Sequence, residues 1–422
     1  MSTARSARVR KVLFVNRFAW PDHSATSQIL TQVSEAVAAS GNDVHIVTSR
    51  ARYSGGGGDL ARQETVNGVT IHRTWTARFG RNNLAGRALD YMSFYASSFL
   101  SVLKHARPGD LVIAKTDPPL LGVTIGFAAV LKGARRANWL QDLYPEVAAE
   151  LGVSLARGPM GGLLRALRNR SLKRSDLVVA IGSRMKERLV SEGLDAARIV
   201  ILPNFSRDDE IAPDPPGTGT LRQAWGFRES DFVVGYSGNL GRAHDYETVL
   251  DAASALRNTV DMKFLFVGGG HAHSLVEQAA RKRGLETLSF QPYQPESQLS
   301  QSLSVPDVHW LSLKPALEGL IVPSKVYGIA AVARPVVMIG DPDGEVGRIV
   351  TQYACGAVFA PGDWEALSDF LKRLQQEPDY RRTLGRNARA WLSEHASRTA
   401  VLGQWPEVLA GIPAAPVPES LA

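Results

Sequence analysis

Glu318 and Lys325 delimit a segment whose residue types and spacing could do chemistry, Glu-Gly-Leu-Ile-Val-Pro-Ser-Lys. Pro323 suits a first helical position, where its missing N–H would have no partner, so Pro-Ser-Lys predicts the first turn of a helix. A helix start offers unpaired N–H groups and a positive dipole end, and with the lysine these suit a diphosphate. Glu318 suits hydroxyl groups instead, as a hydrogen-bond acceptor. The segment predicts a nucleotide-sugar site, with a plain proline-started helix after a loop as the structural alternative.

A glycine-rich turn in the same half of the chain is a second candidate. Gly238, Asn239 and Gly241 follow an apolar run, and a turn at the end of such a strand lets a ligand approach the backbone. Arg242 comes next and could bind phosphate with its fork of donors. A tight strand-to-helix turn with a solvated arginine is the alternative.

Two more segments follow predicted strands. Gln291 ends one strand and Tyr293 lies just beyond it, so backbone groups there could bind the edge of a base beside the tyrosine ring; a plain loop is the alternative. Glu345 stands at a predicted helix start. Asp341 and Asp343 have the spacing of a metal-binding Asp-x-Asp pair, but an Asp-Pro turn explains them better, so no metal is expected.

Length and composition are those of a two-domain globular protein. A chain of 422 residues is too long for one ordinary core, and 44% apolar and 21% charged residues are ordinary contents. Cys355 is the only cysteine, which excludes an intramolecular disulfide and argues against a structural zinc site. No apolar run reaches the ~20 residues of a membrane span. The run behind the basic N-terminus, 12–15, is too short for a signal peptide, so we expect a cytosolic protein.

Charge is divided unevenly along the chain. Residues 1–205 carry a net charge of +13 and residues 206–422 a net charge of −6. This asymmetry suggests that one domain meets an anionic partner, either nucleic acid or an anionic membrane surface. A merely basic domain with solvated arginines is the alternative.

Short apolar strands alternate with helical patterns, which predicts doubly wound parallel sheets of the α/β class. Segment 206–220 lacks periodicity and is rich in Pro, Gly and acidic residues, so it is predicted to be a linker. We expect an N-terminal domain at 1–205, a C-terminal domain at 221–385 and a helical region at 386–422. The predicted strands are 11–16, 43–48, 69–73, 111–115, 136–140, 177–181, 199–202, 232–237, 263–267, 288–291, 308–313 and 335–339, and the four glycines at 55–58 are predicted to form a flexible loop.

A series of motifs spans nearly the whole chain. It comprises Asn16-Arg-Phe-Ala-Trp-Pro, Ala25-Thr26-Ser-Gln, Gln141-Asp142-Leu-Tyr-Pro-Glu, Ser175-Asp-Leu-Val-Val-Ala, Leu202-Pro-Asn, Ser237-Gly-Asn-Leu-Gly, Pro323-Ser-Lys and Gly344-Glu345. In this order the motifs resemble glycosyltransferase family 4, retaining enzymes of the GT-B fold, and most closely its bacterial exopolysaccharide, colanic-acid and O-antigen branch. The resemblance implies two Rossmann-like domains facing a cleft, with the nucleotide sugar bound mainly by the second and the acceptor by the first. It also implies that the C-terminal helical region crosses back onto the first domain.

The sequence departs from the family pattern on the donor side. A second glutamate that usually holds the ribose would fall at Val326, or near Gly328 in the Pro-Ser-Lys branch, and neither is acidic. The resemblance therefore leaves ribose binding to another residue, for which Glu345 is the candidate. The usual phosphate-binding arginine and lysine fall near Asn239 and His244, which leaves Arg242 and Lys325 as replacements. On the acceptor side, Gln141 stands where many members have histidine, and Ala25-Thr26 replaces a Gly-Gly pair.

The resemblance implies a retaining hexosyl transfer. No carboxylate pair suits a double displacement, so we expect front-face attack, in which the leaving phosphate takes the acceptor proton. Lys325 and Arg242 would neutralise the diphosphate, Glu318 would orient the sugar, and no metal or other cofactor would be needed. UDP is expected rather than GDP. The donor-binding residues would be Gly238, Asn239, Gly241, Gln291, Tyr293, Gly319, Leu320, Ile321, Ser324 and Glu345, and the acceptor side would include Ala25, Thr26 and Asp142.

Two segments of the basic half suggest a lipid-linked acceptor. Segment 163–174 combines leucines with Arg165, Arg168, Arg170, Lys173 and Arg174, and segment 91–100 is aromatic and largely apolar. Both could rest on an anionic membrane at the inner face of the plasma membrane, where a polyprenyl-diphosphate-linked saccharide would be the acceptor. Helices packed on the core with a solvated basic face are the alternative.

Other classes remain open at this stage. A sugar-nucleotide epimerase of the GT-B fold would share the architecture, and the missing second glutamate could mark a non-catalytic nucleotide-sugar-binding partner subunit. Nucleic-acid binding is disfavoured, because the basic half contains no recognition motif.

Overall fold

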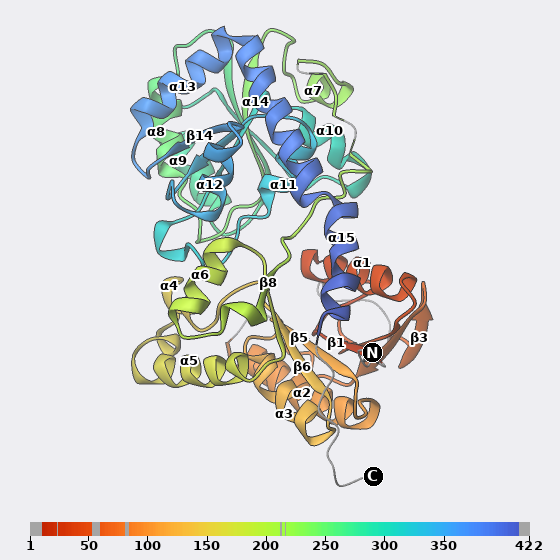
Figure 1. Cartoon of the computed structure of the whole chain (residues 1–422). Coiled ribbons are helices and arrows are strands. Elements are labelled where there is room, and N and C mark those ends of the chain that lie inside the picture. Colours follow the sequence, from red (N-terminus) through yellow and green to blue (C-terminus); the bar gives the residue numbers. More distant parts are fainter. Residues whose placement is uncertain are drawn as a thin grey trace. The chain divides into compact units, whose positions relative to one another are not determined.

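The computed structural model describes residues 11–22, 24–52, 60–80, 84–211, 213–215 and 217–412 (Figure 1). They form two compact units. One holds the described residues up to Leu202 together with those from Leu402 onward, and the other is Pro203–Val401. The predicted glycine loop at 55–58 and the predicted helical region beyond 412 lie outside the described residues. No helix in the described ranges has the length and apolar character needed to cross a membrane.

The described part of the first unit is built on one sheet with the order β3-β4-β2-β1-β5-β6-β7-β8. Neighbouring strands are parallel, apart from the antiparallel pair β3–β4. The order reverses between β1 and β5, and such a switch point opens a crevice at the carboxyl ends of the strands. The strands are β1 (Lys11–Val15), β2 (Asp43–Ser49), β3 (Gln63–Val66), β4 (Val69–Thr74), β5 (Leu111–Lys115), β6 (Arg135–Trp139), β7 (Leu177–Ala180) and β8 (Ile199–Ile201).

Helices cover this sheet, and the last one comes from the far end of the sequence. They are α1 (Ala25–Ala39), α2 (Leu84–His105), α3 (Leu121–Leu131), α4 (Glu146–Glu150), α5 (Gly158–Lys173), α6 (Ser183–Ser191) and the part of α15 (Arg398–Ala410) from Leu402 on. Trp405 of α15 is buried against Trp139, with ring centroids 4.5 Å apart, and against Phe14, at 6.3 Å. Arg135 donates a hydrogen bond of 3.0 Å to the carbonyl of Ile412. The end of the described chain is therefore part of the core of the first unit.

The second unit has a fully parallel sheet of order β11-β10-β9-β12-β13-β14 in its described residues, which is the Rossmann order. The switch point lies between β9 and β12. The strands are β9 (Phe232–Asn239), β10 (Met262–Gly269), β11 (Leu288–Gln291), β12 (Val308–Ser312), β13 (Val336–Ile339) and β14 (Gly356–Phe359). The helices are α7 (Thr220–Ala224), α8 (Glu247–Ala255), α9 (His273–Lys282), α10 (Leu299–Ser304), α11 (Lys325–Ala331), α12 (Glu345–Gln352), α13 (Trp364–Gln376), α14 (Pro378–Trp391) and the start of α15.

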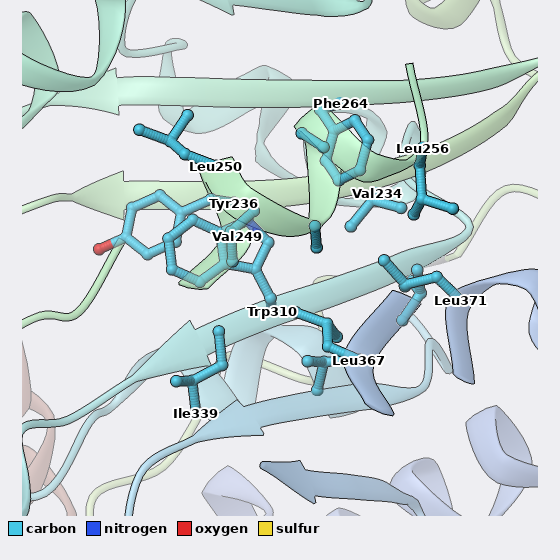
Figure 2. Close-up of a cluster of buried hydrophobic side chains, with 14 of the residues drawn as sticks. Val234, Tyr236, Val249, Leu250, Leu256, Phe264, Trp310, Ile339, Leu367 and Leu371 are labelled. Carbon is cyan, nitrogen blue, oxygen red and sulfur yellow. The ribbon is translucent and has the colours of Figure 1, made fainter. Parts of the chain in front are cut away.

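A buried apolar cluster fixes the central strands of the second sheet (Figure 2). Tyr236 of β9 and Trp310 of β12 pack with ring centroids 4.6 Å apart. Side chains of β9, β10, β12 and β13 meet those of α8 and α13, among them Val234, Val249, Leu250, Phe264, Ile339, Leu367 and Leu371. Burial of this many aromatic and branched side chains holds the carboxyl ends of β9 and β12 in place, and these ends carry the candidate site.

The predicted fold class, two doubly wound parallel-sheet domains, is confirmed, and most predicted strands are present with ends shifted by one or two residues. Two strands were not predicted. Strand β3 is an exposed antiparallel edge without an apolar run, and β14 is a short edge strand that begins with glycine. The segment predicted as a linker, 206–220, belongs to the second unit, where Ser304 accepts a hydrogen bond from the amide of Asp214.

Candidate functional site

The carboxyl end of β9 meets the start of α11 through a glycine. Gly238 has a φ of +120°, and a Cβ at this position would lie 3.2 Å from Cε of Lys325. The absence of a side chain therefore lets the loop after β9 lie directly against the lysine. Lys325 is the first residue of α11, so the sequence motif Pro-Ser-Lys ends where the helix begins, and the prediction that Pro323 occupies its first turn is wrong.

Lys325 faces a histidine that sequence reasoning had not assigned a role. Its Nζ lies 3.3 Å from Nε2 of His244, whose Nδ1 lies 2.6 Å from the carbonyl oxygen of Ser312. Because a carbonyl can only accept, Nδ1 carries the proton and Nε2 presents its lone pair to the ammonium group. Burial and the charge of Lys325 lower the pKa of His244 to about 4, so this imidazole is neutral near pH 7.

Lys325 is a partly buried cation without a counter-ion in the described parts of the chain. Its Nζ has as neighbours the imidazole of His244 and the ring of Tyr236, 5.2 Å from the centroid, and no carboxylate of these parts pairs with it. Burial lowers the pKa of Lys325 to about 8, so the group is still mainly charged at pH 7. A desolvated ammonium among neutral groups favours an anionic ligand.

A cavity of about 240 Å3 adjoins this lysine. Its lining includes four residues predicted from the sequence to bind the donor or act in catalysis, Gly238, Tyr293, Ser324 and Lys325. It also includes His309 of β12, whose Nε2 donates to the carbonyl of Leu303 at 2.8 Å while its buried Nδ1 has no partner among the described residues. His309 gave no sequence signal, because it lies inside an apolar strand.

We expect the buried His309 to lower the free energy of unfolding of the second unit as the pH falls. Burial lowers the pKa of His309 to about 4, while the unfolded chain binds this proton near pH 6.5. The contribution is complete above pH 6.5 and is lost as the pH falls toward 4, at up to about 1.4 kcal/mol per pH unit. Urea unfolding between pH 7.5 and 4.5 should show a shallower pH dependence for His309→Gln than for wild type. The exposed His271→Gln is the control, and equal slopes for all three proteins would contradict the prediction.

Glu318 contacts a different helix start. Its Oε2 accepts a hydrogen bond of 3.2 Å from the amide of Glu345, the first residue of α12. Gly344 makes room for the carboxylate, since a Cβ there would lie 2.3 Å from Oε1. An acidic group at a helix N-terminus is stabilised by the helix dipole, so Glu318 is held in one place as an acceptor. The structure thus brings Glu318 and Glu345 together, and neither residue lines the Lys325 cavity.

Other predicted donor-site residues do not line that cavity. Arg242 is exposed, and Asn239, Gly241, Gln291, Gly319, Leu320 and Ile321 are also absent from its lining. The amides of Leu320 and Ile321 donate to the carbonyl of Leu317, at 3.0 and 3.4 Å. The expectation that these N–H groups are available to a diphosphate is therefore corrected. Val326 is fully buried.

The Asp341–Asp343 pair forms a turn, as its Asp-Pro sequence predicted. The amide of Asp343 donates to Oδ1 of Asp341 at 2.9 Å. Among the residues that the structure describes, no group of three or more His, Cys, Asp or Glu side chains could hold a metal ion.

The first unit gathers polar residues at the carboxyl ends of β1, β5 and β6. Lys115, the last residue of β5, is 2% exposed; its Nζ donates to the carbonyl of Thr26 at 2.8 Å and lies 4.1 Å from the ring centroid of Trp139. Asp142, just after β6, lines the same small cavity as Lys115 and is itself partly exposed. Ala25 and Thr26 begin α1. Lys115 thus bonds to one predicted acceptor-side residue, Thr26, and shares a cavity with another, Asp142. The sequence predicted Lys115 only as the end of a strand.

Lys115 and Asp142 both have pKa values shifted toward neutral pH. Burial lowers the pKa of Lys115 to about 7, against the favourable charges of Asp117 and Asp142. Burial and the charge of Asp117 raise the pKa of Asp142 to about 6, and the charge of Lys115 opposes this rise. Strongly shifted pKa values in a polar crevice at a switch point are typical of functional sites.

Comparison with known proteins assigns both units. The family model described as a glycosyl transferase 4-like domain matches residues 25–204, and the model described as glycosyl transferases group 1 matches residues 218–391. The chain is 27% identical over 361 residues to the putative colanic acid biosynthesis glycosyl transferase WcaI of Escherichia coli, covering 82% of this chain and 88% of that protein.

Solved structures support the same fold. Sucrose-phosphate synthase from Thermosynechococcus elongatus has a TM-score of 0.74 at 16% identity, with 94% of this chain and 98% of that chain covered. HepE from Anabaena, in complex with UDP, has a TM-score of 0.71 at 15% identity, with 94% and 99% covered.

Proposed function

The chain belongs to glycosyltransferase family 4, and on this premise we propose that it transfers a hexose from a UDP-sugar to a lipid-linked saccharide, with retention of configuration. The role would lie in bacterial surface-polysaccharide synthesis. The relative named for colanic acid biosynthesis supports this role, and the UDP complex of a structural neighbour supports the choice of nucleotide.

The observation that carries the proposal is the uncompensated cation in the second unit. Lys325 is partly buried beside a neutral His244 and against the glycine loop, and it lines a cavity that could hold a ligand. A diphosphate would supply the missing negative charge. As the sugar–phosphate bond breaks, charge grows on the phosphate oxygen, and a fixed ammonium stabilises this transition state more than the ground state.

The remaining residues would divide the work between nucleoside and sugar. Tyr293 and Ser324 line the same cavity as Lys325 and would contact the nucleoside. Glu318, fixed at the start of α12, would accept hydrogen bonds from sugar hydroxyls, and Glu345 is the candidate for the ribose. The leaving phosphate would take the proton of the attacking hydroxyl on the same face of the sugar, which retains the configuration without a metal.

A thermal-shift screen followed by a transfer assay tests the proposal. UDP and UDP-hexoses should raise the melting temperature more than GDP and GDP-hexoses, because ligands that bind only the native state stabilise it. With the best donor, free UDP should form only when a lipid-linked saccharide is present. Nucleotide release without an acceptor, together with an altered donor sugar, would indicate an epimerase. Donor binding without any turnover would indicate a non-catalytic subunit.

The surface of the first unit supports attachment to a membrane. Helix α3 contacts both α2 and α5, and the three helices carry exposed apolar side chains, Met92, Leu100, Phe127, Val130, Leu131, Leu163 and Leu167. Arg170, Lys173 and Arg174 are exposed at the end of α5. The basic face is smaller than the sequence suggested, since buried Arg168 pairs with Glu146 and Glu192 and exposed Arg165 also pairs with Glu146.

Flotation with liposomes tests this attachment. The protein should float with vesicles that contain anionic lipid at low salt, and a triple change of Arg170, Lys173 and Arg174 to Ser should weaken binding by about 3 kcal/mol, at about 1 kcal/mol per basic residue. The matched control is a triple change of exposed basic residues in the second unit, Lys282, Lys372 and Arg382, to Ser. No binding of wild type at low salt would contradict the proposal.

A further inference from the structure

Lys115 lies where the acceptor is expected to bind, yet it cannot contact an acceptor itself. It is fully buried, with its ammonium group between the carbonyl of Thr26 and the face of Trp139. Burying a lysine costs free energy unless its charge is paired and hydrogen-bonded. Asp142, just after the neighbouring strand β6, is partly exposed and lines the same small cavity. The partly exposed carboxylate of Asp142 therefore shares its cavity with the buried ammonium group of Lys115.

Two other side chains at this sheet edge have unused hydrogen-bonding atoms. Oδ1 of Asn16, after β1, and Nε2 of Gln141, after β6, are buried and have no partner in the described residues. β5 lies between β1 and β6, so these groups flank Lys115 in the strand order. Buried donors and acceptors are normally paired, so these atoms indicate that a polar partner could complete the hydrogen bonding at the carboxyl ends of β1 and β6, outside the cavity that Lys115 and Asp142 line.

We propose that Lys115 is a positioning residue for the acceptor, which keeps Asp142 ionised so that this carboxylate can accept a hydrogen bond from the attacking hydroxyl. This inference rests on the proposed transfer to a saccharide. Asp142 would not take the proton away; it would orient the hydroxyl so that its oxygen attacks while the leaving phosphate receives the proton.

The groups around the pair decide the direction of the effect. Asp142 is opposed by Asp117 and by its own burial, and Lys115 is the residue whose charge favours ionisation of Asp142. Tyr144 adjoins Asp142, and Arg168, which also lines the cavity, is held by Glu146 and Glu192. Removing the ammonium group leaves the opposing influences in place, so Asp142 should become protonated at a higher pH.

The test compares Lys115→Met with Lys11→Met. Lys11 also bonds a backbone carbonyl, that of His105 at 3.1 Å, and lies 4.0 Å from an aspartate, but at the amino end of β1. The assay uses the best UDP-sugar donor and farnesyl-diphosphate-linked N-acetylglucosamine as acceptor, from pH 5 to 8. In wild type the acid limb of kcat/KM should lie near pH 6. Lys115→Met should move it upward by about one pH unit and raise the KM of the acceptor but not of the donor, while Lys11→Met changes neither.

A second variant and a spectroscopic readout keep the inference testable if Lys115→Met folds poorly. Asp142→Asn should abolish the acid limb, and in protein labelled with [4-13C]aspartate it should remove one carboxyl signal that titrates near pH 6 in wild type. An unchanged limb in a folded Lys115→Met protein, or an acid limb that persists in Asp142→Asn, overturns the inference. If wild type transfers no sugar from any donor, the proposed function is overturned instead. The carboxyl titration can be measured without transfer, so it tests the inference separately.

Discussion

Replacing Lys325 with methionine is expected to lower kcat/KM for sugar transfer by a factor of about 100 to 1,000, the usual cost of removing one fixed donor from a developing negative charge. Methionine keeps most of the side-chain volume, so the glycine loop at Gly238 can still pack against it. Affinity for UDP should also fall, by at least about tenfold, because the cation that would neutralise the diphosphate is gone. Steady-state kinetics and calorimetry with UDP measure the two effects.

The same substitution should leave the protein at least as stable as wild type. Lys325 is partly buried without a carboxylate partner in the described residues, and desolvation that lowers a lysine pKa costs folding free energy. Its removal should raise the free energy of unfolding by about 1 kcal/mol. Exposed Lys314, whose amide bonds to Ala243 in the same loop region, provides the control; Lys314→Met should change neither activity nor stability.

Proton uptake gives a further signature of Lys325. Its pKa of about 8 should rise when an anion binds beside it, so wild type should take up a fraction of a proton on binding UDP near pH 8.5. Calorimetry in buffers of different ionisation enthalpy measures this uptake, which Lys325→Met should lose. Normal sugar transfer by a folded Lys325→Met protein would show that Lys325 has no role at the diphosphate, whereas loss of activity through unfolding would contradict the stability prediction.

Replacing Glu318 with glutamine is expected to lower kcat/KM about 100-fold with little change in UDP affinity. The carboxylate is fixed by the amide of Glu345 and would bind sugar hydroxyls, not the diphosphate. Charge-assisted hydrogen bonds are about twice as strong as neutral ones, so the neutral amide should orient the sugar less well. Stability should fall by about 0.5–1 kcal/mol, since the helix dipole loses its anionic neighbour.

Asp343→Asn serves as the control for Glu318→Gln. Asp343 is an exposed carboxylate in the turn before α12, and its loss should leave transfer within a factor of about two. If Glu318→Gln lost transfer and UDP affinity by the same factor, Glu318 would bind the nucleotide and not the sugar. Transfer within about threefold of wild type would remove Glu318 from the site.

The fold was predictable because both sheets are made of buried parallel strands, whose continuous apolar runs stand out between helical patterns. The missed strands lack this signal. Gln63–Val66 is half exposed and depends on its neighbour β4 for its pairing, and Gly356–Phe359 follows a helix with no break in composition other than its glycine. Helix starts were harder to predict, since Pro323 is also compatible with the turn that precedes α11.

The candidate site was predictable only where a local motif carried it. Gly238, Tyr293, Ser324 and Lys325 were singled out from their own segments, but the pairing of Lys325 with His244 depends on β9 and β12 being neighbours. Lys115, in the first unit, could not be predicted from its local sequence either. It ends an apolar strand, and only the strand order places it beside Asp142 and beneath α1.

The position of Trp405 between Phe14 and Trp139 has a consequence for biosynthesis. The ribosome completes residues up to Leu202 long before it reaches Leu402, where the chain rejoins the first unit. At about 5–20 residues per second, roughly 10–40 s pass between the synthesis of Leu202 and that of Leu402. During this time the core of the first unit lacks Trp405. The second unit, Pro203–Val401, can finish folding in that interval. The part of the protein that is synthesised first is therefore completed last.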